Sequence, residues 1–253
     1  MRTLAVIPAR LGATRLPRKP LRLLGGVPLV LRVWERVREI DVADDCVIAT
    51  DSAEVASAAA EYGADVILTS GDHPTGTDRV AEVARRSEFR RHECILNVQG
   101  DVPFVSAGAL TGACQLVSSG AFPLATAAVP AGLEILTSPS VVKVVTADDG
   151  RALYFSRAPI PFLRDPDDRS LLTGRVHQHI GVYAYQRDAL TRWVALPPHP
   201  LEQIERLEQL RPLAAGIAMG VAFVDELPRA GIDTEDDLAR ANSDWTALTP
   251  QRI

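Results

Sequence analysis

Short β-rich runs alternate with helical patterns along most of the chain. The expected strands are apolar runs rich in β-branched residues, at 3–8, 45–50, 65–69, 93–98 and 124–129. Helical patterns stand between or after them, at 28–39, 51–62, 77–88 and 107–118. Strands that alternate with helices are typical of a mostly parallel sheet. The sequence therefore predicts an α/β fold in which helices flank a mostly parallel sheet.

The pattern changes from about residue 138. Strands are expected at 141–146, 152–156 and 180–185, but prolines and a charged stretch at 164–169 interrupt them. We interpret residues 139–198 as a small inserted β-rich lobe of a single domain that spans 1–253. A helix is expected at 200–210, a strand at 220–224, and a last helix that Thr234 and Asp237 begin and that runs to about Ser243.

The composition mainly excludes classes of protein. With 47% hydrophobic and 23% charged residues, the chain is typical of a globular protein, and a net charge of -5 argues against a nucleic-acid polymer as its partner. Three widely spaced cysteines favour reduced core residues over a disulfide or zinc framework. The apolar start is ended by Arg10, too early for a signal peptide, and the uncharged run at 212–224 is too short to span a bilayer. We expect a cytoplasmic protein.

Lysine is nearly absent. Of the 27 basic residues only Lys19 and Lys143 are lysines, a bias typical of GC-rich codon usage. A lysine in such a chain is a candidate for a position that arginine cannot fill.

The loop after the first expected strand concentrates positive charge. It carries Arg10, Arg15, Arg18 and Lys19 within ten residues, at the strand end where open α/β sheets bind ligands. Cations with small neighbouring residues suit phosphate oxygens. The loop matches neither the P-loop pattern nor the dinucleotide-binding pattern GxGxxG, which argues against P-loop phosphoryl transfer and against a Rossmann dehydrogenase.

As a unit, this loop resembles the N-terminal signature of sugar-nucleotide-forming pyrophosphorylases, and more narrowly that of the 3-deoxy-manno-octulosonate (KDO) cytidylyltransferases, or CMP-KDO synthetases. Eight further segments match that family in order: 49–51, 76–79, 97–101, 142–145, 154–158, 179–183, 201–202 with 207–211, and 231–234. The resemblance implies a Rossmann-like nucleotidyltransferase (GT-A-like) sheet and a β-rich dimerisation lobe that makes a homodimer.

The resemblance also implies a reaction. An acceptor hydroxyl attacks the α-phosphorus of CTP in line and pyrophosphate leaves, so positioning and charge neutralisation supply the rate. Arg10, Arg15 and Lys19 would hold the triphosphate and, with Asp101, form the catalytic set; Asp101 and Asp233 would bind Mg²⁺. The implied CTP-binding residues are Pro8, Ala9, Arg10, Lys19, Gly76, Thr77, Arg79 and Gln99. Without the resemblance, each aspartate would be read as a turn or cap residue, and Gly76 with Thr77 as an ordinary helix start.

An acidic acceptor needs a fixed cation and groups that pair with hydroxyls. The acceptor-binding residues that the resemblance implies are Gln99, Arg157, His179, Tyr183, Glu208 and Gln209. His177 and His179 could instead form a metal pair, but no third ligand follows at a suitable spacing. By spacing alone, Glu202, Glu205 and Glu208 are typical of a solvated helix face.

Three positions depart from the family pattern. The family usually has Ser at position 13, Gly at 18 and Glu at 102, whereas this chain has Ala13, Arg18 and Val102. A more cationic site with fewer carboxylates would suit a smaller or more highly charged anion. An alternative acceptor is therefore a phosphonate such as phosphonoformate, as in phosphonate antibiotic biosynthesis.

Two other classes remain as hypotheses. A non-catalytic nucleotide-binding homologue would be favoured by loss of Lys19, Asp101 or Asp233, and all three are present. A glycosyltransferase on a similar fold would normally carry an Asp-x-Asp pair, whereas Asp101 is followed by Val102 and Pro103.

Overall fold

The computed structural model describes residues 1–12, 15–226, 229 and 231–248, which divide into two compact units. The first unit comprises Arg2–Val105 with Arg229–Ile253, and the second comprises Ser106–Pro228 with Met1. Ala13, one of the departures from the family pattern, lies outside the described residues.

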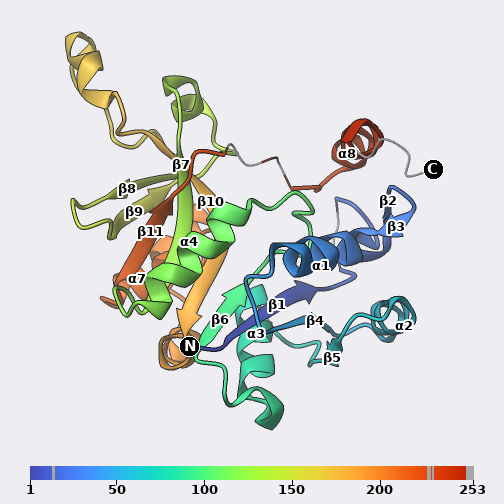
Figure 1. Cartoon of the computed structure of the whole chain (residues 1–253). Coiled ribbons are helices and arrows are strands. Elements are labelled where there is room, and N and C mark those ends of the chain that lie inside the picture. Colours follow the sequence, from blue (N-terminus) through green and yellow to red (C-terminus); the bar gives the residue numbers. More distant parts are fainter. Residues whose placement is uncertain (13–14, 227–228, 230, 249–253) are drawn as a thin grey trace. The chain divides into compact units, whose positions relative to one another are not determined.

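The first unit contains a parallel arrangement of four strands in the order β6-β1-β4-β5 (Figure 1). The strands are β1 (Thr3–Ala9), β4 (Asp45–Thr50), β5 (Val66–Leu68) and β6 (Cys94–Asn97). The helices are α1 (Leu29–Ile40), α2 (Ala53–Tyr62), α3 (Gly76–Arg85) and α8 (Glu235–Leu248). Short elements complete it: η1 (Lys19–Leu21), β2 (Leu23–Leu24), β3 (Val27–Pro28) and η2 (Ser87–Phe89). Helices α1 and α3 contact β1, which is buried along nearly its whole length. The predicted alternation is confirmed.

Local capping explains where the predicted helix boundaries hold or fail. The sequence places Asp51 and Glu54 at the start of α2, but the structure corrects this: Ser52 is the N-cap, and its hydroxyl accepts from the Val55 backbone N–H at 3.3 Å. The predicted stop at Gly63 is confirmed, because Gly63 takes a left-handed conformation with φ 85°. Helix α3 ends at Arg85 rather than 88, since the next residue is extended.

The second unit holds five strands in the order β11-β7-β10-β8-β9, in which β11 and β7 are parallel and the other pairs are antiparallel. They are β7 (Leu124–Pro130), β8 (Lys143–Thr146), β9 (Ala152–Ser156), β10 (His177–Gln186) and β11 (Met219–Phe223). The helices are α4 (Ala107–Ser118), α5 (Arg187–Ala195), α6 (Pro200–Glu205) and α7 (Leu210–Ala214), with 3-10 turns η3 (Leu133–Thr137) and η4 (Pro166–Leu172). Helix α4 packs on β7, β10 and β11. Figure 1 shows the gold segment around η4 projecting away from the strands of this unit.

The single helix predicted at 200–210 is wrong. Helix α6 ends at Glu205 because Arg206 takes a left-handed conformation with φ 55°, and α7 begins only at Leu210. The prolines do not shorten β10, which is four residues longer than the strand predicted at 180–185. Among the described residues, no helix combines the length and the apolar character that crossing a bilayer requires.

Candidate active site

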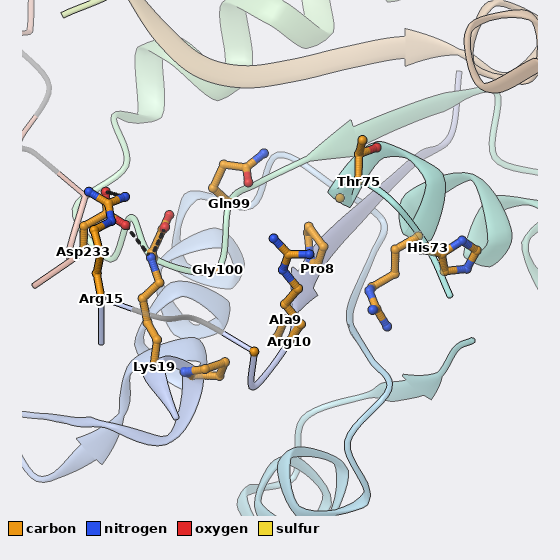
Figure 2. Close-up of a pocket in the computed structure, with 15 residues that line it drawn as sticks. Pro8, Ala9, Arg10, Arg15, Lys19, His73, Thr75, Gln99, Gly100 and Asp233 are labelled. Carbon is orange, nitrogen blue, oxygen red and sulfur yellow. Dashed lines mark hydrogen bonds and ion pairs between the residues drawn. The ribbon is translucent and has the colours of Figure 1, made fainter. Parts of the chain in front are cut away.

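A cavity of about 350 Å³ opens in the first unit at the carboxyl ends of β1 and β6 (Figure 2). The residues that line it come from the cationic loop, the start of α3, the end of β6 and the segment before α8: Pro8, Ala9, Arg10, Gly12, Arg15, Lys19, Pro20, His73, Thr75, Gly76, Arg79, Gln99, Gly100, Asp101 and Asp233. Strand ends of a parallel sheet are where open α/β folds bind ligands, so the predicted location is also where the cavity lies.

Two features fix the walls of this cavity: a close approach of two backbone segments and a cluster of buried apolar side chains. A Cβ at Gly100 would lie 2.8 Å from the carbonyl oxygen of Pro8, so only glycine allows the ends of β1 and β6 to approach this closely. The loop is anchored by apolar packing: Leu16 and Leu24 share one buried cluster with Ile232 and Leu238. This cluster joins the loop that carries Lys19 to the segment that carries Asp233.

Lys19, Asp101 and Asp233 meet in the cavity although 214 residues separate the first from the last. The Lys19 ammonium nitrogen lies 2.6 Å from Asp101 Oδ2 and 2.7 Å from Asp233 Oδ1, as the dashed lines in Figure 2 mark. The Ile232 backbone N–H donates to the Asp101 carbonyl at 2.9 Å. That bond brings the two carboxylates together. The predicted cap of α8 is confirmed, because the Thr234 backbone N–H donates to the Asp237 carboxylate and the Asp237 backbone N–H donates to the Thr234 hydroxyl.

The cavity carries more cations than carboxylates. Burial opposes the charge on Lys19, but attraction to Asp101 and hydrogen bonds to both aspartates together raise the pKa of Lys19 above its ordinary value. Arg15 lies 3.1 Å from Asp233, while Arg10 makes no ion pair with any residue that the structure describes. The unpaired positive charge suits an anion with several negative charges.

Helix α3 presents its N-terminus at the other side of the cavity. Thr75 caps the helix by accepting from the Asp78 backbone N–H at 3.2 Å, and Gly76 lines the cavity. Arg79 is buried; its guanidinium lies 3.4 Å from Asp51 and bonds the Thr69 hydroxyl. Thr77 is buried and is not among the residues that line this cavity, so its contact with CTP stays a prediction.

Sequence reasoning missed His73 and Thr75. His73 lines the cavity, and its Nε2 lies 2.6 Å from Glu82 Oε2, which also accepts from the Ser70 backbone N–H. The signal that could have identified His73 is its position, since a polar ring stands three residues before the Gly76–Thr77 turn. The carboxylate of Glu82 fixes the orientation of this imidazole toward the cavity wall.

The two described departures from the family pattern lie beside the site. Arg18 has φ 58°, a left-handed conformation that favours glycine, and its guanidinium pairs with Glu54. Val102 packs close to Gly231, where a Cβ would lie 3.5 Å from Val102 Cγ1. Arg18 is therefore directed to α2, and Val102 lies beside the segment that carries Asp233.

The remaining predicted acceptor residues lie in the second unit. Arg157 follows β9 and donates from Nε to the Glu205 carbonyl at 2.9 Å. Glu208 and Gln209 follow α6, and Gln209 is buried, with no hydrogen-bond partner for its side-chain nitrogen among the residues that the structure describes. Such a buried, unpartnered donor is a group that a ligand oxygen can satisfy.

His179 and Tyr183 lie on β10 with their rings 5.7 Å apart. Burial lowers the pKa of His179 to about 3, so the imidazole is neutral. The Thr126 hydroxyl oxygen lies 2.8 Å from His179 Nε2, 2.7 Å from the Val182 carbonyl oxygen and 3.1 Å from the Ile180 carbonyl oxygen, so this hydroxyl holds the imidazole in place. Burial first, then the Glu208 carboxylate, raise the pKa of Tyr183 well above its ordinary value, so the phenol keeps its proton.

The expected solvated glutamate face is wrong for two of its three members. Glu202 forms a capping box with His199 and a 2.5 Å ion pair with Arg211. Glu205 accepts from the Ser156 hydroxyl and from the Arg157 backbone N–H. His177 packs its ring against Phe223 with centroids 4.6 Å apart.

Comparisons with known proteins agree with one another. The model of the family described as Cytidylyltransferase matches residues 4–219. A 3-deoxy-manno-octulosonate cytidylyltransferase of Gemmatimonas aurantiaca is 62% identical over 98% of this chain and 96% of its own, and one of Polynucleobacter asymbioticus is 46% identical over 94% and 93%. A solved structure of a CMP:2-keto-3-deoxy-manno-octonic acid synthetase in complex with CTP has a TM-score of 0.90 and 34% identity, and the match covers 98% of this chain and all of that one.

Proposed function

Since this chain belongs to the 3-deoxy-manno-octulosonate (KDO) cytidylyltransferase family, we propose that it joins CMP from CTP to KDO and releases pyrophosphate. A KDO hydroxyl attacks the α-phosphorus of CTP. A new phosphorus–oxygen bond forms, the bond to pyrophosphate breaks, and the hydroxyl proton is lost. One observation carries the proposal: Lys19, Asp101 and Asp233 converge in a cationic cavity at the carboxyl ends of β1 and β6.

Different residues of the cavity bind different parts of CTP. Arg10, Arg15 and Lys19 hold the triphosphate, since each presents a cation to the cavity. Gly76 and the first turn of α3 offer backbone N–H groups to the nucleotide, as helix N-termini do for anions. Gln99, at the end of β6, pairs with a polar group of CTP or of the acceptor.

The chemistry of the two aspartates fits Mg²⁺. The structure already directs both carboxylates at one cation, the Lys19 ammonium, and Mg²⁺ is commonly bound by one or two carboxylates with phosphate oxygens and water. Asp101 and Asp233 would hold the ion, which when bound neutralises charge on the phosphates.

In the second unit, Arg157 binds the KDO carboxylate, and the neutral His179 ring, the Tyr183 phenol, Glu208 and the buried Gln209 amide pair with its hydroxyls. The unpartnered Gln209 nitrogen supports this assignment most directly.

We also propose that residues 139–198 form a lobe that pairs two copies of the chain. Phe162 and Leu171 are 78% and 69% exposed and, with Phe223, line a cavity of about 670 Å³. Large exposed apolar side chains that gather at one cavity are typical of an interaction face. Phe162→Ser with Leu171→Ser should yield monomers in light scattering, whereas Leu68→Ser, an exposed leucine outside the lobe, should leave the mass unchanged. Wild-type protein that is monomeric at micromolar concentration would refute the homodimer.

The cytoplasm, which supplies CTP, is the proposed location. The three cysteines are buried, which suits reduced core residues in a reducing compartment.

Pyrophosphate release tests the reaction. Wild-type protein with CTP, Mg²⁺ and KDO should release pyrophosphate, and Asp101→Asn should lower kcat/KM by at least about 100-fold. The matched control Asp244→Asn changes an exposed aspartate and should keep the wild-type rate. Turnover of phosphonoformate without turnover of KDO would establish the phosphonate alternative, and CTP binding without turnover of any acid would indicate a non-catalytic homologue.

A further inference from the structure

Lys143 is a fully buried lysine of the second unit, at the first position of β8. Its ammonium donates to three backbone carbonyls: to Ser138 at 2.9 Å, to Val141 at 2.7 Å, and to Arg157. An ammonium has three N–H groups, so each is satisfied. The side chain ties the segment before β8 to the residue that follows β9.

Arg157 is the residue after β9 that Lys143 binds, and hydrogen bonds hold both its backbone and its side chain. Its backbone N–H donates to the Glu205 carboxylate at 2.9 Å, and its Nε donates to the Glu205 carbonyl at 2.9 Å. Its Nη1 donates to the Pro139 carbonyl at 3.1 Å, between the two other carbonyls that Lys143 binds. Lys143 therefore fixes both the Arg157 backbone and the segment on which its guanidinium rests.

The charges of this cluster do not balance. The side-chain nitrogens of Arg157 donate to carbonyls, and Arg157 makes no ion pair with a carboxylate of the described part of the chain. Burial, and then the neighbouring Arg157, lower the pKa of Lys143. Glu205 is the carboxylate that both cations share. The cluster keeps an excess positive charge, which an acceptor carboxylate would neutralise.

Arginine would not serve at position 143. The buried pocket is formed by three carbonyl oxygens around one nitrogen, which matches a compact ammonium with three donors. A guanidinium is planar, larger, and carries five donors, some of which would stay unpaired. This accounts for a lysine in a chain where only Lys19 and Lys143 are not arginine among 27 basic residues.

We infer that Lys143 is a positioning residue of the acceptor site, which holds Arg157 in place for the acceptor carboxylate. The inference rests on the proposed function, in which Arg157 binds the carboxylate of KDO. Lys143 touches no substrate and acts through Arg157.

Steady-state kinetics on the full chain test this role. Lys143→Met should raise the KM for KDO about 10-fold or more and leave the KM for CTP within 2-fold. Lys143→Arg should also raise the KM for KDO, since charge without the three-donor geometry does not restore the contacts. Because Lys143 acts through Arg157, the double variant Lys143→Met with Arg157→Ala should have the same KM for KDO as Arg157→Ala alone. Arg151→Met, which removes an exposed cation of the same unit, is the control and should match wild type.

Equal effects on both KM values, or multiplied effects in the double variant, would overturn the inference. If circular dichroism shows that neither Lys143 variant folds, Lys143 serves the stability of the unit, and the inference is likewise overturned. Absence of KDO turnover by wild type would instead refute the proposed function, since that control contains an intact Lys143.

Discussion

Lys19→Met should lower the unfolding free energy of the ligand-free protein by about 2 kcal/mol at pH 8. The Lys19 ammonium lies 2.6 Å from Asp101 and 2.7 Å from Asp233, and hydrogen bonds to charged groups contribute about 1.5–3 kcal/mol each. The Asp233 side chain is 41% exposed, so its bond is discounted to below about 1 kcal/mol, the range of surface ion pairs. The Asp101 bond supplies most of the expected loss.

Urea unfolding followed by circular dichroism measures this loss. The matched control is Arg22→Met, which breaks a pair with Glu235 at 2.5 Å that is largely exposed and should cost less than about 1 kcal/mol. A Lys19→Met protein as stable as wild type, or a control that loses as much, would refute the argument that Lys19 is held between two carboxylates.

The stability that Lys19 contributes should also depend on pH, in a direction that its raised pKa determines. The native pKa of Lys19 is raised above its ordinary value of 10.5, so its stabilisation is fully present below pH 10.5 and is lost as the pH rises through the native pKa. The difference in unfolding free energy between wild type and Lys19→Met should therefore shrink above pH 10.5. A difference that stays constant from pH 8 to pH 11.5 would contradict the ion pair.

Three further predictions concern single side chains. Arg18→Gly should be about 1 kcal/mol more stable in urea than Arg18→Ala, because only glycine is unstrained at φ 58°; equal stability would exclude strain there. Cys46, whose pKa burial raises to about 12, should not react with a thiol reagent in native protein at pH 8, and rapid labelling before unfolding would contradict its burial. The pKa of His179 is about 3 in the folded state, against 6.5 ordinarily, so the unfolded state binds more protons between these values and stability should fall as the pH drops below 6.5. His179→Gln should lose less over that range in urea titrations, and an identical loss would place the effect elsewhere.

The regular elements could be predicted because their signals are local. Strand β4 and helix α4 have the predicted limits, since apolar runs and turn residues mark both ends. The helix expected at 200–210 failed because its break depends on the left-handed Arg206 and on the His199–Glu202 capping box, and neither follows from hydrophobic spacing. Likewise Ser52, rather than Asp51, begins α2, because Asp51 is engaged by Arg79 from another helix.

The candidate site could be predicted only where residue type and position along the chain both point to it. The resemblance to the KDO cytidylyltransferases indicated Lys19, Asp101 and Asp233, and their positions past expected strand ends made a shared site at the edge of the sheet geometrically reasonable. The partners of Lys143 could not be predicted, because they are backbone carbonyls, which every residue carries. The orientation of His73 by Glu82 was missed for a similar reason: the two residues meet through the fold of the loop before α3.

The measurement that tests the central claim most directly is identification of the product. Wild-type protein incubated with CTP, Mg²⁺ and an equal mixture of KDO and phosphonoformate is analysed by phosphorus NMR and mass spectrometry. The proposed function predicts CMP-KDO with one pyrophosphate for each molecule formed, and no CMP-phosphonoformate. CMP-phosphonoformate without CMP-KDO, or unchanged CTP after prolonged incubation, would contradict it.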